Sequence, residues 1–213
     1  MGISKLAVVG ATGNVGREML NILSERNFPC DEVIALASER SEGDAVPFGN
    51  KEIIVQSLSN YDFSETSIAL YSAGGKISEV YAPIAAEQGC IVIDNSSKFR
   101  MDNDVPLIVP EVNIEMLEHY RTTNIVANPN CSTIQMVVAL KPLEDLASIN
   151  RINVSTYQST SGAGKVAMEE LFNQTKGVFV HDQAKPEQFT KKIAFNVISS
   201  VWLANSLDQY IAK

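Results

Sequence analysis

One cysteine in this sequence has the surroundings of a reactive thiol. Cys131 lies in the loop 128–133, directly before the apolar run 134–140, which we expect to form a buried helix. The free N–H groups and the positive end of the macrodipole at a helix N-terminus favour the thiolate, the form that attacks a carbonyl carbon. The same N–H groups can hold a developing oxyanion. The alternative is an inert buried cysteine, which is a common state of free thiols.

A glycine-rich loop near the N-terminus has the context of a dinucleotide site. The segment GATGNVG, residues 10–16, follows an apolar run and precedes an amphipathic pattern. Glycines at a strand–helix junction let the backbone approach a pyrophosphate, which then lies on the helix N-terminus. The spacing G-x-x-G-x-x-G differs from the commoner G-x-G-x-x-G, so a plain tight turn is the alternative, and the strand–turn–helix context favours the nucleotide.

The segment after the second apolar run bears on which dinucleotide binds. It reads SERS, residues 38–41, at the position where an acidic side chain takes the ribose hydroxyls of NAD. Arg40, flanked by hydroxyls, suits a 2′-phosphate and favours NADP. Glu39 in the same loop leaves NAD open, and a solvated polar turn is the alternative to both.

Further loops follow predicted strands at 72–75 (SAGG) and 94–100 (DNSSKFR), in addition to the cysteine loop. Ligands of open α/β sheets bind at the carboxyl ends of the strands, so we expect these loops to converge on one crevice. Arg100 is the strongest anion ligand among them. The alternative interpretation is that Arg100 is an ordinary exposed arginine on the surface.

A second glycine-containing loop, QSTSGAG at 158–164, lies between a predicted strand and a predicted helix. Gly162 and Gly164 allow close approach of the backbone to a ligand, and Gln158 can orient a carbonyl or carboxylate. An ordinary left-handed turn is the alternative.

The elements that must position these loops alternate between short apolar runs and amphipathic patterns. Runs of this kind suit strands buried on both faces of a parallel sheet. We expect strands at 6–9, 33–36, 53–55, 68–71, 91–93, 107–109 and 125–127, and helices over 15–23 and 77–85, the latter stopping at Gly89. The pattern predicts an α/β fold with a doubly wound, Rossmann-type sheet.

A second domain is expected after the sheet. The sequence predicts a helix from residue 132 to Pro142, a strand at 152–157, a helix at 166–176 closed by Gly177, and a loop at 180–190. We therefore expect a nucleotide-binding domain over residues 1–127 and a catalytic domain over 128–213.

Composition excludes several classes of function. The net charge of −8, with Lys and Arg scattered singly, argues against a nucleic-acid surface. Three cysteines without C-x-x-C spacing favour a reducing cytoplasm and provide no metal site. No signal peptide precedes the first strand, and no run approaches the roughly 20 apolar residues of a transmembrane helix. We expect a cytoplasmic protein without a membrane or nucleic-acid partner.

Taken in order, these segments resemble the aspartate-β-semialdehyde dehydrogenase family. The resemblance extends over residues 1–198 through GATGNVG, SERS, SAGG, DNSSKFR, VPEVN, PNCST and STYQSTSGAG, of which the last two are the most specific. It implies NADP-dependent interconversion of aspartyl phosphate and aspartate semialdehyde through a cysteine acyl-thioester. This step belongs to lysine, threonine, methionine and diaminopimelate biosynthesis. The family's members are usually homodimers.

The resemblance also implies roles for individual residues. Cys131 would form the acyl-thioester, Gln158 would hold the substrate, and Arg100 would bind phosphate or the substrate's phosphoryl group. The residues that would contact NADP are Thr12, Gly13, Asn14, Val15, Arg40, Ser41, Ser161 and Gly162.

The family's general acid/base histidine has no counterpart in these 213 residues. In the family it occurs in a Gly-His context that corresponds to positions beyond residue 213, and neither His119 nor His181 matches that context. The sequence also departs from the family after residue 198. The resemblance therefore implies an incomplete α+β catalytic and dimerisation domain. General acid–base catalysis is typically worth about 10²–10⁴-fold, so we expect slow turnover from this chain alone.

Two alternatives differ in what they predict. N-acetylglutamyl-phosphate reductases have a glycine before the cysteine and lack the STYQ segment, so Asn130 and Gln158 disfavour that reading. A truncated remnant that binds NADP without turning over is the alternative from another class of function. Measuring NADP binding and thiol alkylation separately from turnover distinguishes it.

Overall fold

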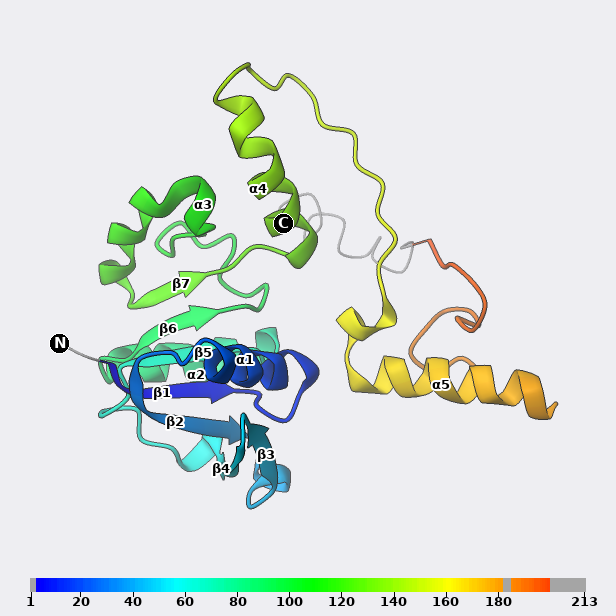
Figure 1. Cartoon of the computed structure of the whole chain (residues 1–213), viewed down its shortest axis with the longest axis horizontal. Coiled ribbons are helices and arrows are strands. Elements are labelled where there is room, and N and C mark those ends of the chain that lie inside the picture. The colour runs from blue at the N-terminus through cyan, green and yellow to red at the C-terminus, as the bar shows by residue number, and fades with distance from the viewer. Residues whose placement is uncertain (1–2, 182–184, 200–213) are drawn as a thin grey trace. The chain divides into compact units, whose positions relative to one another are not determined.

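The computed structural model describes residues 3–181 and 185–199 of the 213-residue chain (Figure 1). The chain divides into two compact units, with the division between Asn150 and Arg151. The expected domain boundary between residues 127 and 128 stays a prediction.

The first unit is built on a seven-stranded sheet whose order is β3-β4-β2-β1-β5-β6-β7. All neighbours pair in parallel except β3 and β4, which are antiparallel. The strands are β1 Ile3–Val9, β2 Cys30–Ala37, β3 Ala45–Phe48, β4 Lys51–Ser57, β5 Ile68–Tyr71, β6 Ile91–Asp94 and β7 Ile125–Ala127. The order extends in opposite directions from the β1–β5 pair, which confirms the doubly wound α/β fold and sets its switch point there.

Strand β1 shows why continuous apolar runs make this sheet. Leu6 and Val8 pack in a buried cluster with Leu20 of helix α1 (Asn14–Glu25), whereas Ala7 and Val9 pack in another with Ala82 of helix α2 (Gly75–Glu87). Side chains of a strand alternate between its two faces. Both faces of the sheet are therefore covered, and every position of the run needs an apolar residue.

Three α-helices and two 3-10 helices of the described residues lie after β6. They are α3 Pro110–Asn113, the 3-10 helix Ile114–Thr122 and α4 Cys131–Glu144 in the first unit, and the 3-10 helix Thr160–Ala163 and α5 Lys165–Val180 in the second. Two shorter 3-10 helices, Glu39–Ser41 (η1) and Leu58–Asn60 (η2), follow β2 and β4.

The prediction of a strand at 107–109 is wrong. Only an isolated bridge joins Leu107 to Ala127, and helix α3 begins at Pro110. The side chain of Asn113 accepts a hydrogen bond from the Val109 N–H (2.9 Å) and donates one to the Leu107 carbonyl (2.9 Å). The bridge to β7 uses other groups, the Ile108 N–H and the Pro106 carbonyl, and Pro110 has no N–H with which the ladder could continue. The bonds to Asn113 satisfy locally the groups on the opposite edge of the segment.

Edge strand β3 was not anticipated from the sequence. It contains Pro47, which lacks the N–H of a ladder residue, and among the described strands it pairs with β4 alone. Proline is tolerated on an edge strand because one side of the backbone faces away from the sheet.

The expected burial of α4 is also wrong. No residue of α4 is buried in the described structure, and the helix continues past Pro142 to Glu144. Apolar composition predicted burial, but burial depends on a covering surface that the described part of the chain does not place over this helix.

In the second unit, two sequence expectations fail. Residues 152–157 form no strand, and Ile152 and Val154 are 48% and 58% exposed, because no described strand pairs with this segment. Helix α5 does not close at Gly177, which is buried within it, but ends at His181 in the left-handed conformation (φ 57°).

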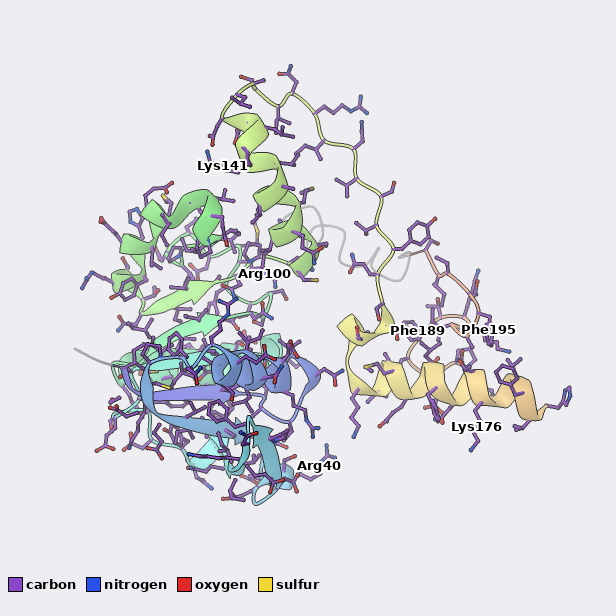
Figure 2. The ribbon with its side chains drawn as sticks, in the orientation of Figure 1. Arg40, Arg100, Lys141, Lys176, Phe189 and Phe195 are labelled. Atoms are coloured by element: carbon purple, nitrogen blue, oxygen red, sulfur yellow. The ribbon has the colours of Figure 1, made fainter. Side chains whose placement is uncertain are left out.

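The segment 188–195 packs along α5. The Gln174 side chain, 1% exposed, accepts hydrogen bonds from the Ile193 and Ala194 N–H groups at 2.8 and 3.2 Å. The Phe179 and Phe195 rings meet edge to face, with 6.1 Å between their centroids. Figure 2 shows Phe195 beside α5. Of the loop expected at 180–190, Val180 is helical and residues 182–184 lie outside the described residues.

Candidate active site

The glycine loop brings the end of β1 against the β5–α2 loop. Gly10 has a φ of 86°, and a Cβ there would lie 2.9 Å from the Ala73 nitrogen. A Cβ at Gly16, in the first turn of α1, would lie 2.2 Å from the Gly10 carbonyl oxygen. Both contacts are with backbone, so this strand–helix junction needs glycine at both positions.

The start of α1 offers donors for an anion. Gly13 is the N-cap and supplies no side-chain acceptor, while the first-turn N–H groups of a helix have no intrahelical partner. The positive end of the macrodipole adds to the attraction. A pyrophosphate beside this turn has the donors that it requires.

A cavity of about 590 Å³ opens beside this loop. Gly10, Thr12, Gly13, Ala37, Ser38, Glu39, Arg40, Leu58, Ser59, Ser72, Ala73, Ile77 and Tyr81 line it. The cavity brings together Thr12, Gly13 and Arg40 from the predicted set. Asn14, Val15 and Ser41 do not line it, although Asn14 follows Gly13 and Ser41 follows Arg40 in the sequence.

Where η1 lines the cavity, it carries both an acidic and a basic side chain. The Glu39 carboxylate accepts a 2.7 Å hydrogen bond from the Ser59 hydroxyl, whereas Arg40 makes no ion pair within residues 3–181 and 185–199. Figure 2 shows Arg40 at the β3–β4 end of the first unit. Ser59 and Tyr81 were missed from the sequence. The polar segment directly after the predicted strand at 53–55 was the signal that could have found Ser59.

Cys131 is the first residue of α4 and is exposed. Asn130 is the N-cap, and its side-chain oxygen accepts hydrogen bonds from the Ser132 N–H (3.1 Å) and the Ser132 hydroxyl (2.7 Å). The Cys131 sulfur lies 3.7 Å from the same oxygen. The thiol therefore occupies an accessible helix N-terminus, where an anion is stabilised.

The other two cysteines have different surroundings. Cys90 is fully buried, and burial raises the pKa of its thiol to about 12. Burial also raises the pKa of Cys30, with the negative charge of Asp31 adding to the effect. Cys131 is the exposed one of the three, and its role as the nucleophile stays a prediction.

Arg100 joins the cysteine loop to the loop after β6. Its Nε donates to the Asn128 carbonyl at 2.7 Å and its Nη2 donates to the Asn95 carbonyl at 3.0 Å. Burial lowers the pKa of Arg100, and the negative charges of Asp94 and a Cys131 thiolate oppose that shift. A guanidinium has five N–H donors, so three remain after these two bonds. Figure 2 shows Arg100 beside the first turn of α4.

The loop that carries Asn95 is held by a buried carboxylate. Asp94 is fully buried and accepts hydrogen bonds from the Ser78 hydroxyl (2.7 Å), the Ser96 N–H (3.0 Å) and the Ser96 hydroxyl (2.6 Å). The Asp94 carbonyl accepts from the Asn128 N–H at 2.9 Å. The carbonyls that orient Arg100 are thus fixed on both sides.

Three predicted site residues lie in the second unit. Gln158 is exposed and donates to the Thr156 hydroxyl at 3.3 Å. Ser161 donates from its N–H and its hydroxyl to the Ser159 hydroxyl oxygen, at 3.2 and 3.0 Å, in the turn that includes Gly162. Their assignments to substrate and NADP stay predictions.

Two further properties bear on function. Within the described ranges, His, Cys, Asp and Glu residues form no group of three that could hold a metal ion. No helix among the same residues has the length and apolar character needed to cross a bilayer.

Comparison with known proteins gives two family models in sequence order. The semialdehyde dehydrogenase NAD binding domain matches residues 5–120, and the semialdehyde dehydrogenase dimerisation domain matches residues 140–208. Aspartate-semialdehyde dehydrogenase 2 of Vibrio cholerae is 54% identical over 196 residues, which cover 92% of this chain and 58% of that protein.

Solved structures agree with these matches. The crystal structure of aspartate semialdehyde dehydrogenase II of Vibrio cholerae complexed with ASA has a TM-score of 0.88 and 54% identity, covering 91% of this chain and 58% of that chain. The Candida albicans aspartate semialdehyde dehydrogenase with NADP has a TM-score of 0.60 and 26% identity, covering 68% and 47%. The chain thus spans 58% of the Vibrio cholerae enzyme and 47% of the Candida albicans enzyme.

Proposed function

This chain belongs to the semialdehyde dehydrogenase family, and from that premise we propose that it carries the NADP-binding domain and the nucleophilic cysteine of an aspartate-semialdehyde dehydrogenase. The observation that carries the proposal is the exposed Cys131 at the N-terminus of α4, next to a loop that Arg100 ties in place. The 54% identity to the Vibrio cholerae enzyme supports the choice of substrate.

The residues of the first unit fit a dinucleotide. The cavity beside Gly10 and Gly13 admits a pyrophosphate to the start of α1, and Arg40 at its far end suits a 2′-phosphate. NADP supplies hydride transfer when bound. The NADP complex of the Candida albicans enzyme supports NADP over NAD.

The chemistry of the cysteine follows from its position. The Cys131 thiolate would form a bond to the aldehyde carbon of aspartate semialdehyde, and the oxygen that becomes negative would face the N–H groups of α4. Transfer of a hydride from that carbon to the oxidised NADP that the cavity would hold, with the oxygen's electron pair re-forming the C=O bond, would leave an acyl-thioester on Cys131. Phosphate then attacks the acyl carbon, the C–S bond breaks, and aspartyl phosphate is released. In biosynthesis the sequence runs in reverse.

Arg100 is the residue that we assign to phosphate. Two of its donors hold backbone carbonyls at 2.7 and 3.0 Å, which fixes the plane of the guanidinium, and the remaining donors suit a phosphate oxygen pair. From the second unit we assign Gln158 to the substrate and Ser161 and Gly162 to NADP.

We also propose that the protein forms a homodimer in a reducing cytoplasm. The match of residues 140–208 to a dimerisation domain supports the dimer. Large apolar side chains exposed in the second unit, which include Phe172, Phe179, Val180, Phe195 and Val197, support an interface there. The free state of Cys30, Cys90 and Cys131 supports a reducing compartment.

The experiment that tests the proposal separates binding from thiol chemistry. NADPH binding is measured by fluorescence titration, and alkylation by iodoacetamide is mapped by mass spectrometry in wild type and in the Cys131→Ser variant. We expect NADPH to bind both proteins and alkylation at residue 131 to be fast in wild type. A folded wild-type chain that binds no NADPH, or whose Cys131 reacts no faster than Cys30, contradicts the proposal.

A further inference from the structure

We propose that Ser59 sets the coenzyme preference of the nucleotide cavity by holding the Glu39 carboxylate, so that Arg40 and not Glu39 meets the adenosine ribose. This inference rests on the proposed binding of a nicotinamide dinucleotide. In this fold an acidic side chain accepts hydrogen bonds from the ribose hydroxyls of NAD, whereas an arginine binds the 2′-phosphate of NADP. Here both kinds of side chain are adjacent and line one cavity.

The hydrogen bonds that link Glu39, Ser59 and Ser57 can run in one direction only. A carboxylate only accepts, so the Ser59 hydroxyl uses its single proton on the Glu39 Oε1 at 2.7 Å. The 2.9 Å contact between the Ser57 and Ser59 hydroxyls must then be a donation from Ser57. Ser57 is 3% exposed at the carboxyl end of β4. Glu39 is therefore tied through two hydroxyls to a buried strand end.

The orientation of Glu39 also constrains Arg40. Both belong to η1, and successive side chains of a 3-10 helix point roughly 120° apart because it has about three residues per turn. Fixing Glu39 against Ser59 of η2 therefore turns Arg40 away from Ser59. Within residues 3–181 and 185–199 no carboxylate pairs with Arg40, which leaves its guanidinium for a ligand phosphate.

The charge of Glu39 discriminates between the two coenzymes. Two unit charges about 4 Å apart in water interact by ~1 kcal/mol, which is about fivefold in affinity. A Glu39 released from Ser59 could approach the 2′-phosphate of NADP and repel it. The same released carboxylate could accept the two ribose hydroxyls of NAD. Loss of the Ser59 hydroxyl should thus weaken the binding of NADP and strengthen the binding of NAD.

The test is a double-mutant cycle read out by binding. Dissociation constants for NADPH and NADH are measured by fluorescence titration at low salt, where charge effects are largest. The proteins are wild type, Ser59→Ala, Glu39→Gln and the double variant. Ser59→Ala should lower the preference for NADPH over NADH about fivefold, because the released Glu39 charge repels the 2′-phosphate. Glu39→Gln should raise this preference, because it removes that charge.

Three controls separate this mechanism from simple damage. In the Glu39→Gln background, Ser59→Ala should change the preference by less than about twofold, because the charge on which it acts is gone. Ser59→Thr keeps the hydroxyl and should keep the wild-type preference. Glu42→Gln makes the same charge change on an exposed side chain that does not line the cavity, and should leave the preference within about twofold of wild type.

The outcomes separate this inference from the proposed function. A wild-type chain that binds NADPH, with a Ser59→Ala variant of unchanged preference, overturns the inference alone. The inference is also overturned if Ser59→Ala changes the coenzyme preference equally in wild type and in the Glu39→Gln background. Ser59 would then act independently of the Glu39 charge. A folded wild type that binds neither coenzyme overturns the proposed function and the inference together.

Discussion

The junction between β1 and α1 allows a quantitative prediction for Gly16→Ala. An added Cβ would lie 2.2 Å from the Gly10 oxygen, 2.7 Å from the Gly10 carbonyl carbon and 2.9 Å from the Ala11 Cα. All three neighbours are backbone atoms, so no side-chain rotation relieves the contact. Overpacking typically costs about 1–3 kcal/mol, and contacts this short belong at the upper end.

Helix propensity acts in the opposite direction. Alanine in a helix is better than glycine by ~1 kcal/mol, so the net destabilisation should be about 2 kcal/mol. The displaced atoms belong to the loop assigned to the pyrophosphate. NADPH affinity should therefore fall by roughly tenfold, the equivalent of ~1.4 kcal/mol.

Urea unfolding followed by circular dichroism, together with NADPH titration, measures both effects. Gly75→Ala is the matched control, because it also adds one methyl at the start of a helix, and its nearest neighbours are 3.9 Å away. That variant should be as stable as wild type or slightly more stable. A Gly16→Ala protein with wild-type unfolding midpoint and wild-type NADPH affinity would refute the reasoning.

Three further predictions concern the cysteines and the loops around Arg100. Burial raises the pKa of Cys90 to about 12 from 9.0, so the folded state keeps the thiol proton more firmly than the unfolded state. The resulting stability is complete below pH 9 and is lost as the pH rises towards 12. Between pH 7 and 10, wild type should lose ~1.4 kcal/mol more than Cys90→Ala in urea unfolding, and equal losses would contradict this. Asp94→Ala leaves the Ser78 and Ser96 hydroxyls without their acceptor and should cost about 2–4 kcal/mol by the same measurement, so a cost below 1 kcal/mol would be inconsistent with the network. Arg100→Lys cannot reproduce the fork of donors, so inorganic phosphate should slow alkylation of Cys131 in wild type but not in the variant. Equal protection in both proteins would exclude Arg100 as the phosphate ligand.

Much of the sheet could be predicted because its strands are buried on both faces. A run such as Leu6–Val9 is apolar throughout because its alternate side chains pack into separate clusters under α1 and α2. The run at 107–109 has the same composition but is flanked by Pro106 and Pro110, and Asn113 satisfies its backbone. Composition alone does not distinguish these two cases.

The second unit shows the opposite limit of sequence reasoning. A strand exists only with a hydrogen-bonding partner, and for residues 152–157 no partner lies among the described residues. The run 134–140 is as apolar as a core helix, yet its burial depends on a surface supplied by other segments. Local pattern predicted the helix correctly and its environment wrongly.

Site residues divide in a similar way. The exposure of Cys131 at a helix start follows from local order, because Asn130 is a strong N-cap and the apolar run fixes where the helix begins. The partners of Arg100 could not be predicted, since Asn95 and Asn128 come from loops after different strands. The same holds for Glu39 and Ser59, which are twenty residues apart. Such contacts arise from strand order.

Strand order also explains why the cysteine loop and the anion ligand form one structural unit. Strands β6 and β7 are neighbours, with Asp94 beside Ala127, so the loops that follow them leave the sheet together. The Asn128 N–H donates to the Asp94 carbonyl, and the Asn128 carbonyl accepts from Arg100, which also binds Asn95. A displacement of either loop therefore moves the guanidinium relative to Cys131. Because buried Asp94 fixes one of these loops through three hydrogen bonds, the spacing between thiol and guanidinium is set by the sheet and not by the exposed surface.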